Sequence, residues 1–132
     1  MSEAADLIGV PEMTLRTWLA RVPFNDFTGI KKANRVFLSC QDAYFFLLVR
    51  EMTRFGVPVR SAMHEARDIA DAMDEALPNG ERLVIRHGAG SHGFEIINDP
   101  DFTTDSGAIL PLRSLAVGLI ERAAVVYLEE AN

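Results

Sequence analysis

The chain has 132 residues, the length of one domain or of two very small ones that share a core. Hydrophobic residues make up 48% of it and charged residues 24%, a balance that excludes a disordered chain. The longest apolar run, Ala43–Val49, is far shorter than the roughly 20 residues needed to span a membrane. No secretory signal opens the sequence, and the lone Cys40 excludes an internal disulfide. We therefore expect a cytoplasmic protein with no membrane attachment.

The net charge of −6 conceals an uneven distribution along the chain. Residues 1–60 hold eight Lys/Arg against six Asp/Glu, which leaves a balance of +2. Residues 61–132 hold five Arg against thirteen Asp/Glu, a balance of −8, and no lysine. The first half alone could therefore offer a basic face to nucleic acid.

Two short helices are predicted at the start. Ser2 can cap a helix that ends near Ile8, where Gly9-Val10-Pro11 interrupts the pattern. A second helix is expected over Pro11–Arg21, because proline suits a first helical turn, where its missing N–H would have no partner. Its apolar stripe consists of Leu15, Trp18 and Leu19.

Between Pro23 and Leu38 the helical period is lost, and the pattern predicts a β-hairpin with a basic tip. Ser39 then opens a long helix that Gly56 closes. This helix is apolar nearly all round, so we expect it at the buried centre of the fold. A second long helix is predicted from Val59 to Leu77.

The second half predicts a further hairpin and a last helix. Leu83–Ile85 and Phe94–Ile97 are β-rich runs on either side of a glycine-rich turn. Residues 98–107 are predicted to be a surface loop, and a helix is expected over Leu112–Glu130. The fold class is thus mainly α with small β-hairpins: a winged helix-turn-helix with two longer helices, then a β-hairpin and a C-terminal helix. We expect a DNA-binding domain over 1–77 and a dimerisation or partner-binding extension over 78–132.

Small and apolar residues recur over the first two helices as they do in helix-turn-helix proteins: Ala4, Ala5, Ile8, Val10, Leu15 and Trp18, with Gly9 at the turn. Residues 2–60 resemble the winged helix-turn-helix of the MerR superfamily of transcription regulators. The resemblance lies in 2–11, in Thr14–Trp18, in Arg35–Phe37, and in Arg50–Val59. The long heptad helix through which MerR regulators dimerise is missing, and residues 59–97 are more similar to compact antitoxin or phage regulators.

The resemblance implies that the second helix enters the major groove and that the hairpin touches phosphates. On this sequence the second helix supplies Thr14, Arg16, Thr17 and Arg21, and the hairpin supplies Lys31, Lys32, Asn34 and Arg35. Arg16 is the side chain best equipped for a bidentate guanine contact, although it could equally bind a phosphate. Trp18 lies on the apolar stripe and is expected to be structural.

Other chemistry is poorly represented in the sequence. Residues 88–93 fit a G-x-G-x-x-G pattern, but a strand is predicted after them, not the helix that would hold a pyrophosphate, so a plain hairpin turn is the better interpretation. His87 and His92 flank that turn without a third metal ligand. No nucleophile and base form a catalytic set. We expect no enzyme activity, no cofactor and no metal.

The sequence thus predicts a regulator that binds specific double-stranded DNA. Three alternatives remain. The first is an antitoxin whose acidic half neutralises a toxin, and the second is a phage or gene-transfer activator that contacts RNA polymerase. The third is a small enzyme, against which the absence of a nucleophile–base pair argues. We also expect a homodimer built on the last helix, whose core side is Leu112, Leu115, Ala116, Leu119, Ala123, Tyr127 and Leu128. Its surplus Val117, Val125 and Val126 need another cover, either a second copy or the hairpin over 83–97.

Overall fold

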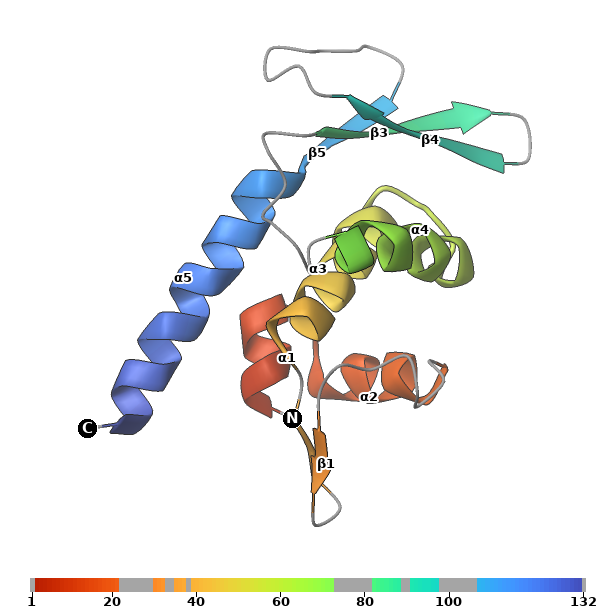
Figure 1. The fold of residues 1–132 in the computed structure, drawn as a ribbon. Coiled ribbons are helices and arrows are strands. Elements are labelled where there is room, and N and C mark those ends of the chain that lie inside the picture. Colours follow the sequence, from red (N-terminus) through yellow and green to blue (C-terminus); the bar gives the residue numbers. More distant parts are fainter. Residues whose placement is uncertain are drawn as a thin grey trace.

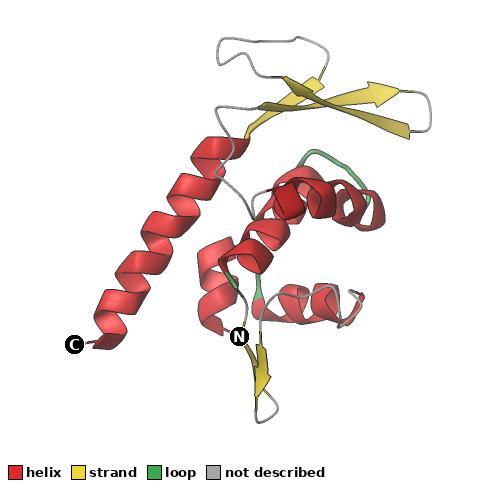
Figure 2. Ribbon diagram, viewed as in Figure 1, coloured by secondary structure: helices red, strands yellow, loops and turns green. Residues whose placement is uncertain are grey.

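The structure is a computed structural model that describes residues 2–21, 30–32, 35–37, 39–72, 82–88, 91–97 and 107–131. It confirms the predicted fold class, because the described part is mainly helical with a small antiparallel sheet and a C-terminal helix (Figures 1 and 2). The helices are α1 (Ser2–Ile8), α2 (Glu12–Arg21), α3 (Cys40–Arg54), α4 (Val59–Ala72) and α5 (Leu112–Ala131). The strands are β1 (Ile30–Lys32), β2 (Arg35–Phe37), β3 (Arg82–Gly88), β4 (Ser91–Ile97) and β5 (Gly107–Pro111).

The ends of α3 are fixed by the residues that the sequence predicted. The Ser39 hydroxyl accepts a hydrogen bond from the Asp42 N–H at 3.1 Å, and the Asp42 carboxylate accepts one from the Ser39 N–H at 3.2 Å. This capping box satisfies two N–H groups at the start of the helix. At the other end Gly56 has a φ of +88°, and the next N–H, that of Val57, donates to the Met52 carbonyl at 3.2 Å. The pattern is a Schellman C-cap.

Helix α3 is the centre of the core, as its apolar composition predicted. Every residue from Asp42 to Val49 is buried, and α1, α4 and α5 each pack against the helix. The Gln41 amide donates to the Ala70 carbonyl at 2.8 Å, and the Arg67 guanidinium lies 4.5 Å from the centre of the Phe45 ring. The two predicted segments, 1–77 and 78–132, share one core, because buried residues of α3 and of β3 belong to the same cluster. The structure describes α4 to residue 72, so the predicted end at Leu77 lies outside the described residues.

A three-stranded antiparallel sheet in the order β4-β3-β5 covers one end of the helical core (Figure 1). The predicted β3–β4 hairpin is present and longer than expected, with Arg82 paired to Ile97 and Gly88 to Ser91. The G-x-G-x-x-G stretch therefore runs into β4, and no helix follows it. Strand β5 was not predicted: Gly107, assigned to the surface loop, opens a strand that pairs with β3. Its close approach requires glycine, since a Cβ at Gly107 would overlap the Ile85 carbonyl oxygen.

Helix α5 follows β5 directly and runs from the sheet down one side of the molecule past α1 (Figure 1). The buried Tyr44 hydroxyl donates to the Leu112 carbonyl at 2.9 Å, which fastens the start of α5 to α3. The Arg122 guanidinium donates to the Leu7 carbonyl at 3.3 Å, which ties α5 to α1. None of the helices within the described residues is long and apolar enough to cross a bilayer.

Candidate nucleic-acid interface

The turn between α1 and α2 depends on a left-handed glycine. Gly9 has a φ of +85°, and the Ala5 carbonyl accepts hydrogen bonds from the N–H groups of Gly9 and Val10 at 2.8 and 3.1 Å. A Cβ on Gly9 would lie 3.2 Å from the Cζ atom of Arg50 on α3. A side chain here would therefore strain the backbone and press on the arginine that covers the turn. The glycine sets the angle at which α2 leaves α1.

One side of α2 is held by the core. Leu15 is fully buried, and Trp18 retains 7% of its surface. The Trp18 indole stacks on the Phe46 ring of α3 with the ring centres 6.5 Å apart and an angle of 10° between planes. The structure thus agrees with the expectation that Trp18 is structural. Because this face is fixed on α3, the opposite face of α2 is presented outward.

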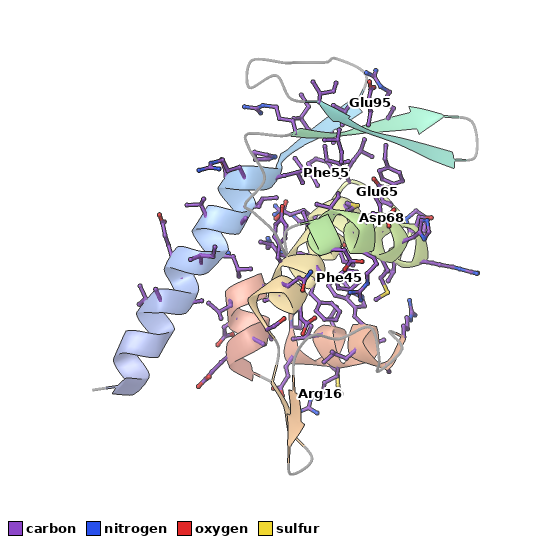
Figure 3. All side chains as sticks on the ribbon, in the orientation of Figure 1. Arg16, Phe45, Phe55, Glu65, Asp68 and Glu95 are labelled. Carbon is purple, nitrogen blue, oxygen red and sulfur yellow. The ribbon has the colours of Figure 1, made fainter. Side chains whose placement is uncertain are left out.

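The outward face of α2 carries four exposed side chains, of Met13, Arg16, Thr17 and Arg21, and the small Ala20. The guanidinium of Arg16 donates from Nη2 and Nε to Oε1 of Glu12, at 2.8 and 3.2 Å. Figure 3 shows Arg16 on the edge of α2 turned away from α3. Thr17 donates from its hydroxyl to the Met13 carbonyl at 2.9 Å.

The sequence-predicted positions on α2 do not all lie on that face. Arg16, Thr17 and Arg21 are exposed, whereas Thr14 is only half-exposed and lies toward the flank of the helix. Met13, at the centre of the face, was not predicted, because sequence reasoning assigned apolar residues to the core. The signal that could have revealed it was its rotation: Met13 stands opposite the stripe of Leu15 and Trp18.

The predicted basic hairpin is present as β1 and β2. Lys31 pairs with Val36, and Lys32 pairs with Arg35, so two basic positions stand opposite each other at the tip end of the ladder. Asn34, which was also predicted to touch DNA, lies outside the described residues. The hairpin projects from the end of the molecule that carries α2, away from the sheet of β3, β4 and β5 (Figure 1).

The arginines of α2 and α3 differ in how carboxylates pair with them. Glu51 accepts from Arg50 at 2.7 Å and from Arg54 at 3.4 Å, so one carboxylate holds both α3 cations. Arg16 is paired with Glu12, but its side chain keeps 59% of its surface exposed. Arg21 has no carboxylate partner within the part of the chain that the structure describes. The Arg54 side chain is also 59% exposed, and Glu51 offsets only one of the two α3 cations, so α2 and α3 both present positive charge in this region.

A carboxylate with a shifted pKa lies elsewhere, on α4. Burial raises the pKa of Glu65, the neighbouring Asp68 carboxylate raises it further, and His64 opposes the rise. Figure 3 shows Glu65 and Asp68 on α4, well separated from Arg16. No group of three or more His, Cys, Asp or Glu side chains that could hold a metal ion occurs among the described residues.

Comparison of the chain with protein-family models, curated proteins and solved structures gave no match. The arrangement itself is therefore the basis for inferring a function.

Proposed function

We propose that the chain is a transcription regulator that binds specific double-stranded DNA through a MerR-like winged helix-turn-helix, and that it acts in the cytoplasm. The observation that carries the proposal is the outward face of α2. It is exposed, it carries Arg16 and Arg21, and it lies at the same end of the molecule as the hairpin with Lys32 and Arg35. A helix that is about 10–12 Å across with its side chains fits a major groove about 12 Å wide.

In this proposal α2 enters the major groove with its outward face toward the base edges. Arg16 is the residue that reads a guanine. Its Nε edge is occupied by Glu12, which leaves Nη1 and the outer hydrogen of Nη2 for the O6 and N7 acceptors of guanine. Glu12 would thus position the guanidinium before DNA arrives. Arg21, one and a half turns farther on, is placed to bind a phosphate.

The hairpin supplies the second contact. Lys31 and Lys32 lie in β1 and Arg35 in β2, so three cationic residues fall within the five sequence positions 31–35 around the tip. Cations at such a site bind phosphates, which fixes the protein on the duplex and adds affinity that does not depend on sequence. The resemblance to MerR regulators assigns the same task to the hairpin.

We further propose a homodimer through α5, because one recognition helix reads few bases and paired half-sites are the usual remedy. Leu112, Ala116 and Leu119 are buried within the chain, whereas Ile120 and Val125 remain 39% and 55% exposed. The β3–β4 hairpin packs near the start of α5 and leaves Val125 uncovered (Figure 1). A second copy of α5 would cover these side chains, since a two-fold interface uses the same patch twice.

DNA binding is tested by selecting sites from a random duplex pool and measuring their binding by fluorescence anisotropy at several salt concentrations. With roughly 4–6 phosphates neutralised per subunit, log K should fall with log salt at a slope of about −4 to −5 per subunit. The double variant Lys31→Glu, Lys32→Glu should weaken binding to all sequences and flatten the slope. Arg16→Ala should instead relax the preference at one base pair. Arg86→Glu, an exposed arginine on β3 at the far end of the molecule, is the matched control.

Two results would contradict the proposal. A pool that yields no preferred sequence removes sequence-specific binding, and unchanged affinity in the lysine double variant removes the hairpin from the interface. The dimer has a separate test in sedimentation equilibrium at micromolar concentration. Val125→Glu should give a folded monomer, while Ile96→Glu, at a position 51% exposed on β4, should leave the dimer intact. A wild-type monomer would refute the dimer alone.

A further inference from the structure

Met13 is an apolar side chain on the side of α2 that faces away from the protein core. It keeps 74% of its surface exposed, more than any other large apolar side chain among the described residues. Successive residues of an α-helix are rotated by about 100°, so Met13 stands opposite the midpoint of Leu15 and Trp18, the two side chains that fix α2 on the core. The thioether is therefore at the centre of the outward face.

The neighbours of Met13 on that face are the polar groups described above. Arg16 follows three residues later and Thr17 four, so both flank Met13 on the helix surface. The Thr17 hydroxyl gives its hydrogen to the Met13 carbonyl, and Arg16 is held to one side by Glu12. Neither polar group covers the thioether, which stays open to a ligand that approaches α2 from outside.

The DNA group that fits such a side chain is the C5-methyl of thymine. It is the one apolar group that a base edge presents in the major groove, and apolar side chains contact it in known complexes. Methionine is unbranched and polarisable, which lets it adapt to a small methyl group at the floor of a groove. A single exposed apolar residue is ordinary on a protein surface. Met13 differs from such a residue because it lies between Arg16 and Thr17, on the face of α2 that is proposed to meet the base edges.

We propose that Met13 reads the C5-methyl of a thymine close to the guanine that Arg16 contacts. The inference rests on the proposed function and adds a specificity-determining residue to it. Side chains three residues apart on a helix are about 5–6 Å apart at Cβ, and base pairs follow one another every 3.4 Å. The thymine should therefore lie within about two base pairs of the guanine.

The experiment replaces each thymine of the selected duplex, one at a time, by deoxyuridine, which lacks only the C5-methyl group. Wild-type protein should bind one of these duplexes about fourfold more weakly, the effect of one lost buried methyl group. Met13→Ala should bind the thymine and deoxyuridine duplexes equally. Met13→Leu should keep part of the discrimination. Ile96→Ala, which shortens an exposed apolar side chain on β4, is the matched control and should discriminate like wild type.

The outcomes separate the two proposals. Specific binding in which no deoxyuridine weakens the complex, or in which Met13→Ala still discriminates, overturns the role of Met13 and leaves the DNA-binding function standing. Failure of the random pool to yield any preferred duplex overturns the proposed function, and the role of Met13 with it. Both proposals are supported if Met13→Ala, and not the control variant, binds the thymine and deoxyuridine duplexes equally. The thymine concerned must also lie near the base pair at which Arg16→Ala relaxes the sequence preference.

Discussion

Replacing Trp18 by alanine should destabilise the whole fold, although the residue belongs to the helix that we place in the DNA groove. Trp18 is 7% exposed and stacks on Phe46, so its indole joins α2 to the central helix. A buried aromatic side chain removes about 150–250 Å² from water, which at about 25 cal/mol per Å² corresponds to about 4–6 kcal/mol. Alanine retains part of this burial. The expected loss is about 3–5 kcal/mol, the usual range for such a truncation.

The assay is urea denaturation followed by far-UV circular dichroism, with the wild type also followed by the fluorescence of Trp18, its only tryptophan. With a slope of about 2 kcal/mol per molar urea, the midpoint of Trp18→Ala should fall by about 2 M. Trp18→Phe keeps an aromatic ring against Phe46 and should lose less. Met13→Ala, on the opposite side of the same helix, should change stability by less than about 0.5 kcal/mol. A Trp18→Ala protein with the wild-type midpoint would refute the reasoning.

Five further substitutions have outcomes that follow from particular features of the structure. Gly56→Ala should cost about 1 kcal/mol for its left-handed backbone alone, and Gly9→Ala should cost more in the same thermal or urea assay, because its Cβ also meets an arginine. Gly107→Ala should cost about 1–3 kcal/mol by pushing two strands apart, and exchange of the strand amides should accelerate. Tyr44→Phe should lose about 1 kcal/mol with its buried hydrogen bond. Because the folded state raises the pKa of Glu65, the free energy of unfolding should fall as pH rises through the range just above 4.5, and Glu65→Gln should flatten that dependence in urea titrations at a series of pH values.

Local patterns predicted most of the helices and both hairpins because their causes lie within a few residues. The Ser39–Asp42 box and the left-handed Gly56 act across one turn, so the ends of α3 could be read from the sequence. The β1–β2 and β3–β4 hairpins join neighbouring segments, and the turn residues beside their strands predicted them. The excess of positive residues in the first half of the chain could be counted directly in the sequence.

Strand β5 could not be predicted in this way. It has five residues, ends in Pro111, and gains its hydrogen bonds from β3, which precedes it by some twenty residues. Its identity as a strand comes from that distant partner and not from its own period. Met13 was missed for a related reason. Hydrophobicity alone predicts burial, and only the fixed position of Trp18 against α3 shows which side of α2 is left outside.

The two hydrogen bonds that fasten α5 have a consequence for synthesis of the chain. Tyr44 and Leu112 are 68 residues apart, and Leu7 and Arg122 are 115 apart, so the packing of α1 and α3 is completed by residues that are translated much later than those two helices. Contacts of such long sequence separation slow folding, because the ends of a long loop must first meet. On the ribosome the apolar surface of α1 and α3 that faces α5 would therefore stay uncovered until α5 emerges. Truncation before residue 112 should trap that state and make the nascent protein a substrate for chaperones.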